Sequence, residues 1–266
     1  MKDSGKVSFN GLVTSTGMSA QSVAKKFDFN YCASNYKEIL NDKNDVVAIT
    51  TRHDTHSKAI CNALAANKNV YVEKPLALSV SELEDINKAY TDNAKSQIMV
   101  GFNRRFAPST NEIIQHFESV KSPLVINIRV NAGFIPADHW TQDAQEGGGR
   151  MIGEGCHFID LASAITKSNV KTIYAVGSSK EEKSALLNDN LCLSLTFENG
   201  SIANITYTAD GSKAMSKEHI EVFGGGRSAQ IKDFKEILLF DGDKKVKDKK
   251  LGSQDKGQKS MIDSWL

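Results

Sequence analysis

The amino-acid sequence predicts an α/β protein in which a parallel sheet with crossover helices is followed by an α+β part built on a large, mainly antiparallel sheet. Between Val46 and Phe102, short apolar runs alternate with stretches of helical period, a pattern typical of strands joined by crossover helices. From about Leu124 onward, most runs are strand-like and are separated by turn signals such as Glu198-Asn199-Gly200. A chain of 266 residues, 40% of them hydrophobic, is long enough to bury a core in each part.

In the first part, predicted strands and helices follow one another in turn. Ile60, Ala63 and Leu64 fall on one helical face, and Leu83 and Ile86 fall on one face of a later helix. The expected strands are 6–13, 46–50, 69–72 and 97–101, and the expected helices are 20–27, 56–66 and one around 83–89.

In the second part, one predicted helix backs a sheet of short strands. The expected helices are 111–118 and about 150–166, and the expected strands are 124–132, 173–177, 190–197, 201–208, 219–223, 228–231 and 236–240. The lysine-rich stretch 244–250 is expected to be a solvated turn. A boundary near 103–108 divides the chain into predicted domains 1–105 and 106–266.

Composition excludes several classes of partner. A net charge of +1 gives no overall field to gather nucleic acid or anionic lipid. No stretch approaches the length of about 18 apolar residues that a membrane helix needs, and the N-terminus has no targeting pattern. The four cysteines are far apart and form no metal-binding pattern, so we expect reduced thiols, no metal site and a cytoplasmic location.

The strand expected at 69–72 is followed by Glu73-Lys74-Pro75, which delivers a lysine to the carboxyl edge of the parallel sheet. Ligands of open α/β sheets bind at that edge. Taken alone, a lysine beside a proline at a strand end is more often a solvated surface residue.

This tripeptide resembles the Glu-Lys-Pro motif of the Gfo/Idh/MocA family, the relatives of glucose-fructose oxidoreductase and inositol dehydrogenase. The resemblance extends over almost the whole chain. It implies a Rossmann-like domain followed by an α+β domain, a sugar substrate, and NAD or NADP as cofactor. It further implies that Lys74 contacts the substrate hydroxyl and the nicotinamide, that Glu73 lies on the cofactor side, and that the Lys74–Pro75 bond is often cis.

A second match lies one strand earlier, in Thr50-Thr51-Arg52-His53-Asp54-Thr55-His56. It is similar to the family's Thr-Pro-Asn-x-x-His segment beside the cofactor, from which Arg52 and Asp54 depart. The resemblance places Thr51 and His56 on the cofactor side. Without it, His56 is equally well explained as a histidine at the start of a helix.

A third match, in 147–161, is similar to the family's glycine-rich helix start followed by an Asp-x-x-x-His pair. It places His157 on the catalytic histidine, but the aspartate position holds Gly153, for which Glu154 could substitute only loosely. Glu154, His157 and Asp160 would share a helical face, so either carboxylate could orient the imidazole. An ordinary i,i+3 ion pair is the alternative.

The stretch Asn103-Arg104-Arg105-Phe106 resembles the family's crossing into the second domain, where it approaches the substrate. We predict that Arg104, together with Glu154 and Asp160, contacts the substrate. The pyrophosphate of a nucleotide sugar is a group that the Arg104 guanidinium could bind. A solvated loop is the usual explanation of such a pair.

The sequence lacks the strand, G-x-G-x-x-G turn and helix that cradle a dinucleotide pyrophosphate. We expect a unit truncated at both ends, missing on the order of 20 to 30 residues at its start. Loss of a central first strand would leave open edges on both neighbouring strands. Two other glycine clusters, 147–153 and Gly224-Gly225-Gly226-Arg227-Ser228-Ala229, lack a strand before them or a helix after them.

The leading interpretation is a truncated NAD(P)-dependent oxidoreductase acting on a sugar or nucleotide-sugar hydroxyl, with Lys74 and His157 meeting at one cleft for proton transfer. No acid follows the strand at 6–13, which favours NADP slightly over NAD. The residues of the motifs at 51–54 and 150–154 are most similar to those of the unit that follows an alcohol-dehydrogenase-like domain in bi-domain oxidoreductases. The alternative is a non-catalytic remnant that serves sugar binding or homo-oligomerisation through the antiparallel sheet.

Overall fold

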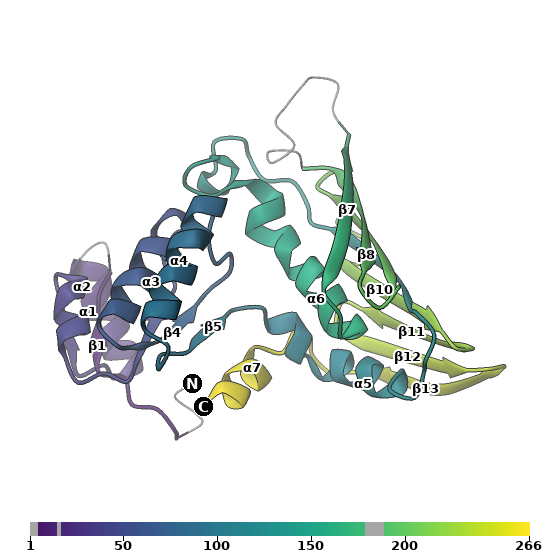
Figure 1. Cartoon of the computed structure of the whole chain (residues 1–266), viewed down its shortest axis with the longest axis horizontal. Helices are drawn as coiled ribbons and strands as arrows, with labels where there is room; N and C mark the ends of the chain where they lie inside the picture. The colour runs from purple at the N-terminus through teal and green to yellow at the C-terminus, as the bar shows by residue number, and fades with distance from the viewer. Residues whose placement is uncertain (1–4, 15–16, 179–188) are drawn as a thin grey trace. The chain divides into compact units, whose positions relative to one another are not determined.

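The computed structural model describes residues 5–14, 17–178 and 189–266, and most of its helices and strands are labelled in Figure 1. The chain divides into two compact units. Unit 1 comprises Met1–Gly101 and Ile262–Leu266, and unit 2 comprises Phe102–Met261.

Unit 1 contains two separate parallel sheets. β3 (Val46–Ile49), β4 (Asn69–Val72) and β5 (Ile98–Val100) form the larger one, in that order, and β1 (Gly11–Leu12) pairs with β2 (Tyr31–Cys32) in the other. In the part of the chain that the structure describes, neither β1 nor β3 has a strand partner on its second edge. The prediction of parallel strands in this part of the chain is confirmed, whereas the short strand β2 was not predicted.

Helices connect these strands and cover them with apolar side chains. The helices are α1 (Gly17–Phe27), α2 (Tyr36–Asn41), α3 (His56–Ala65) and α4 (Val80–Asp92), and α7 (Gln258–Trp265) ends in unit 1. Ile60 and Leu64 of α3 and Ile86 of α4 are buried in one cluster with Val70 and Val72 of β4. α3 and α4 are therefore the two crossover helices expected from the sequence.

Unit 2 is built on one eight-stranded sheet in the order β13-β12-β11-β10-β6-β9-β8-β7. Its only parallel pair among the described strands is β6 with β9, and the other neighbours are antiparallel. The strands are β6 (Val125–Asn131), β7 (Val170–Gly177), β8 (Leu191–Phe197), β9 (Ile202–Thr208), β10 (Glu218–Gly224), β11 (Arg227–Lys232), β12 (Glu236–Asp241) and β13 (Lys244–Lys250).

The lysine-rich stretch expected to be a solvated turn is β13, so that prediction was wrong. It pairs antiparallel with β12 and forms one edge of the sheet. A run that is mostly lysine carries no apolar signal, yet an edge strand needs a partner on one side only, and charged side chains are common there.

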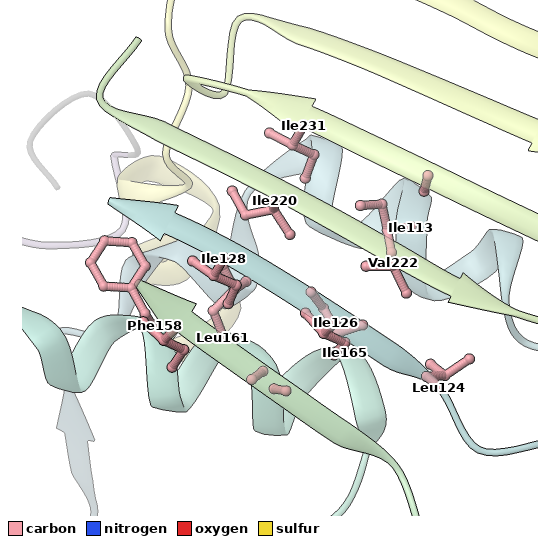
Figure 2. Packing of buried hydrophobic residues seen from close by; sticks show 14 of the residues in the cluster. Ile113, Leu124, Ile126, Ile128, Phe158, Leu161, Ile165, Ile220, Val222 and Ile231 are labelled. Atoms are coloured by element: carbon pink, nitrogen blue, oxygen red, sulfur yellow. The ribbon is translucent and has the colours of Figure 1, made fainter. Parts of the chain in front are cut away.

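Helices α5 (Pro108–His116) and α6 (Cys156–Thr166) pack on one face of this sheet (Figure 2). Phe158, Leu161 and Ile165 of α6 meet Ile126 and Ile128 of β6 in the buried core. Along β8, buried core positions alternate with exposed ones. Within residues 5–14, 17–178 and 189–266, no helix combines the length and apolar character needed to cross a membrane.

Neither glycine cluster forms a strand-to-helix turn, as the sequence predicts. Gly225 and Gly226 make the tight β10–β11 hairpin turn, with φ of 57° and 76°. Gly148 and Gly149, also at positive φ, lead into a short π-helix, Met151–Gly155, that precedes α6.

Candidate functional site

Two predicted site segments of unit 1 lie at one edge of the parallel sheet. Ile49 and Val72 are register partners at the carboxyl ends of β3 and β4, so Thr51 and Lys74 follow neighbouring strands. Lys74 is half-buried, and its bond to Pro75 is cis, as the resemblance implies. This is the sheet edge at which open α/β folds bind ligands.

The side chain of His56 contacts the backbone of both segments. Its side chain is fully buried, with Nδ1 2.7 Å from the carbonyl oxygen of Pro75 and Nε2 3.1 Å from that of Thr51. A neutral imidazole donates through one nitrogen only, so one of these contacts at a time is a hydrogen bond in that state. The geometry gives His56 a positioning role in the turn that carries Lys74; direct contact with a cofactor stays a prediction.

Thr51 is exposed at the start of this turn. The hydroxyl of Thr55 donates to the carbonyl oxygen of Arg52 at 2.8 Å, so in the 2.5 Å contact between the two threonine hydroxyls Thr51 is the donor. The short 3₁₀-helix His53–Thr55 leads directly into α3. Its compact shape places Thr51 beside the carboxyl end of β3.

Glu73 is oriented by its neighbour on β4. The Tyr71 hydroxyl donates to Glu73 Oε1 at 2.7 Å. Burial raises the pKa of Tyr71 far above its usual range, and the bonded carboxylate adds to the shift, so the phenol remains a donor. A Cβ on Gly101 would lie 2.7 Å from Glu73 Oε2, and the glycine therefore leaves room for the carboxylate.

In unit 2, His157 lies in the first turn of α6. Its side chain is buried, and its ring meets the ring of Phe102 edge-on, with centroids 5.9 Å apart. The preceding π-helix replaces the regular α-helix that the sequence predicts from about residue 150. Single π-turns inside helices are frequent at functional sites.

Glu154, in the π-helix, is the centre of a polar network. Its Oε2 accepts hydrogen bonds from Tyr207 at 2.6 Å and Arg150 at 3.4 Å, and its Oε1 accepts one from Lys217 at 2.6 Å. Burial alone would raise the pKa of Glu154, but the Lys217 ammonium, the Tyr207 hydroxyl and the Arg150 charge together lower it to about 2. The carboxylate is thus the shared counter-ion of two cations.

Sequence reasoning missed Tyr207 and Lys217 as partners of Glu154. The available signal was the inward position of Tyr207 in the alternating strand β9, because a buried phenol usually finds a hydrogen-bond partner. The pairings span 53 and 63 positions along the chain, which local patterns do not encode.

Asp160 forms a two-armed ion pair with Arg105, through contacts of 2.5 and 2.9 Å. Burial raises the pKa of Asp160, and Arg105 partly offsets that effect. The predicted shared face of Glu154, His157 and Asp160 assumes regular α-helical spacing, which the π-turn at Glu154 interrupts. A shared face of these three side chains stays a prediction.

Arg104 is buried rather than exposed in a solvated loop. It holds Glu218 through two hydrogen bonds of 2.8 Å, Lys256 contacts the same carboxylate at 2.6 Å, and the guanidinium lies over the ring of Phe158. This arrangement stabilises the fold of unit 2, and a substrate contact by Arg104 stays a prediction.

Two family models match successive parts of the chain. One, described as the oxidoreductase family with an NAD-binding Rossmann fold, matches residues 1–102, and the other, the GFO/IDH/MocA C-terminal domain, matches residues 122–229. The chain belongs to the Gfo/Idh/MocA family. The family predicted from the sequence is thereby confirmed.

Curated relatives in this family are moderately similar. The uncharacterized oxidoreductase YrbE of Bacillus subtilis is 29% identical over 215 residues, which cover 79% of this chain and 62% of the relative. Inositol 2-dehydrogenase of Salmonella paratyphi B is 32% identical over 144 residues, or 53% of this chain and 41% of the relative. The chain thus spans roughly four to six tenths of these relatives' length.

Solved structures share the fold. An oxidoreductase domain protein from Kribbella flavida matches 91% of this chain and 71% of its own, with a TM-score of 0.79 and 21% identity. Levoglucosan dehydrogenase in complex with NADH matches 96% of this chain and 78% of its own, with a TM-score of 0.80 and 19% identity.

Three of the predicted cofactor-side residues of this family member lie at a sheet edge of the kind that binds ligands. Thr51, Glu73 and Lys74 lie at the carboxyl edge of β3 and β4, where a nicotinamide would need polar partners. In the part of the chain that is described, no glycine-rich turn connects a strand to a helix N-terminus, the arrangement that cradles a pyrophosphate.

Proposed function

We propose that this family member is an NAD(P)-dependent oxidoreductase that acts on a hydroxyl of a sugar or nucleotide sugar. The observation that carries the proposal is the placement of Lys74 at the carboxyl edge of two paired parallel strands, in a turn held by buried His56. The relatives named for inositol and levoglucosan dehydrogenation support a polyhydroxylated substrate.

Oxidation of a secondary alcohol removes a hydride from carbon and a proton from oxygen. A bound nicotinamide supplies the hydride acceptor. In this proposal Lys74 holds the substrate hydroxyl and receives or relays its proton, and His157 serves as the second proton-transfer group. His56 and Glu73 are positioning residues for the Lys74 turn, and Arg104, Glu154 and Asp160 are proposed on the substrate side.

Either NAD or NADP is accepted in this proposal, with NADP slightly favoured. The end of β1 is followed by Val13 and Thr14, neither of which is the acid that would bind an adenosine ribose. Ser15 and Thr16, the other hydroxyl residues of that segment, lie outside the described residues. The free state of all four cysteines supports a proposed cytoplasmic location.

Titration of the chain with NADH and NADPH, followed by cofactor fluorescence, tests the proposal. Micromolar binding of either supports it, and no binding at millimolar cofactor supports the non-catalytic alternative. Lys74→Ala should abolish turnover while leaving the circular dichroism spectrum nearly unchanged. Lys58→Ala, an exposed lysine of α3, is the matched control and should retain turnover.

A second proposal concerns homo-oligomerisation through the open face of the eight-stranded sheet. Ile202, Val125 and Phe223 are register partners across three strands, and each is more than a third exposed. Such a row of apolar side chains is typical of a surface that another protein covers. Sedimentation should show an oligomer that Phe223→Lys dissociates, whereas Val246→Lys, at an exposed valine of β13 outside the row, should not.

A further inference from the structure

The polar network around Glu154 holds more positive than negative charge. Arg150 and Lys217 both contact the Glu154 carboxylate, so two cations share one anion. Arg150 is buried and also donates to the carbonyl oxygen of Gly133 at 3.1 Å. Tyr207 adds a neutral hydrogen bond, and the cluster as a whole therefore carries a surplus charge of one unit.

A second cluster in unit 2 shows what distinguishes this one. Glu218 is likewise shared by two cations, Arg104 and Lys256, but there the Lys256 side chain is only 16% exposed. The Lys217 side chain is 39% exposed. The surplus charge of the Glu154 cluster is accessible from solvent, whereas that of the Glu218 cluster is largely enclosed.

Lys217 is also fixed in place at both ends. Its carbonyl oxygen accepts a 2.7 Å hydrogen bond from the backbone N–H of Asn131, and its ammonium lies 2.6 Å from Glu154. One contact to Glu154 uses one of the three ammonium donors and leaves others for a further partner. A charged donor held in this way binds an oxyanion with little loss of side-chain freedom.

The cluster lies close along the chain to the predicted catalytic histidine. Glu154 is in the π-turn immediately before α6, and His157 is in the first turn of that helix. Both are parts of one continuous helical segment in unit 2. A group that Lys217 binds would therefore be near this segment, on the substrate side of the proposed site.

We propose that Lys217 is a specificity-determining residue that binds an anionic group, a carboxylate or phosphate, carried by the sugar substrate. That the bound sugar is a substrate rests on the proposed function. The preference for an anionic sugar depends only on residues of unit 2. Glu154 is then a positioning residue that holds the ammonium, anchored by Tyr207 and Arg150. Preference for an acidic over a neutral sugar follows from the accessible surplus charge.

Calorimetric or NMR binding measurements without cofactor test the proposal, with D-glucose, D-glucuronate and D-glucose 6-phosphate as probes. Either anionic probe should bind about tenfold more tightly than glucose, since one ion pair commonly contributes a factor of that order. Lys217→Met should bring the three affinities within about twofold, and Lys217→Arg should keep the preference. Added salt should weaken only the binding of the anionic probes.

Lys245→Met is the matched control, because Lys245 is another exposed lysine in an ion pair, with Asp248 at 2.7 Å. It should leave the preference unchanged. Equal or undetectable binding of the three probes to the unmodified chain, or a preference that survives Lys217→Met, overturns the proposal. Anion preference together with failure to bind NADH or NADPH would reject the redox function alone.

Discussion

The guanidinium of Arg104 and the carboxylate of Glu218 are joined by two hydrogen bonds of 2.8 Å, and their side chains are only 6% and 0% exposed. The pair connects the 3₁₀-helix Asn103–Phe106 to the start of β10, and Lys256 contacts it from the C-terminal segment. One carboxylate thus holds three distant segments of unit 2 together.

Removing this carboxylate leaves two cations without an anion in a buried place. Glu218→Gln should lower the free energy of unfolding by about 3 kcal/mol or more, as is usual when one partner of a buried ion pair is lost. Urea denaturation near neutral pH measures the change. Asp241→Asn, which breaks a largely exposed pair with Arg227, should cost less than about 1 kcal/mol. Similar losses for the two variants would contradict the structural role of Glu218.

The lowered pKa of Glu154 makes stability depend on pH. The folded state holds this pKa at about 2, against an ordinary value of 4.5, so its contribution is present above about pH 4.5 and is lost as the pH falls toward 2. The difference in unfolding free energy between the unmodified chain and Glu154→Gln should therefore narrow by about 2 kcal/mol from about pH 6 to about pH 3. Asp160, whose pKa is raised, has the opposite pH dependence, but it is present in both proteins and cancels. If the difference in unfolding free energy between the two proteins stayed constant over this pH range, the network around Glu154 would not be what lowers its pKa.

Gly257 is required where the chain passes close to the segment 103–107. It has φ of +85°, and a Cβ there would lie 2.4 Å from the backbone nitrogen of Ala107 and 2.5 Å from the carbonyl oxygen of Asn103. Gly257→Ala should cost roughly 3 kcal/mol or more in thermal or urea unfolding. Gly242 has φ of +53° with no atom within 4 Å of an added Cβ, so Gly242→Ala isolates the conformational cost of about 1 kcal/mol. Equal losses of stability in the two variants would show that the backbone near Gly257 shifts to make room for the added Cβ.

The open edge of β3 predicts an alternating pattern of hydrogen exchange. Glu73 donates to the carbonyl oxygen of Ile49 and Asn69 to that of Asp45, so by the parallel ladder the odd positions face β4. The amides of Val47 and Ile49 should exchange at least about tenfold more slowly than those of Val46 and Ala48, after correction for intrinsic rates. Protection of all four amides would mean that another strand pairs with this edge in solution.

The sequence predicts the elements well wherever local periodicity is strong. The strand 69–72 and the helix beginning at His56 have the expected starts, because short apolar runs and helical spacing report burial directly. It does not predict β13, since its lysines face solvent and its place depends on pairing with β12. The π-turn before α6 is equally invisible, because it arises from packing and not from residue period.

For the site, the motifs identify which residues deserve testing but not what each one contacts. His56 could be placed near a strand end, yet its link to the carbonyl of Pro75 depends on how the chain returns 19 residues later. Arg104 was predicted to contact substrate, with a solvated loop as the alternative, and the structure buries it against Glu218, which lies 114 positions away. Pair formation over such distances is set by the fold as a whole.

The last strand of the large sheet has a consequence for how copies of the protein can stack. β13 contains five lysines and one aspartate, and it forms an outer rim whose backbone groups would otherwise be available to another chain. Two such rims repel each other when they approach side by side, which disfavours growth into extended fibrils. The lysines of this edge strand thus disfavour open-ended association of copies through strand pairing.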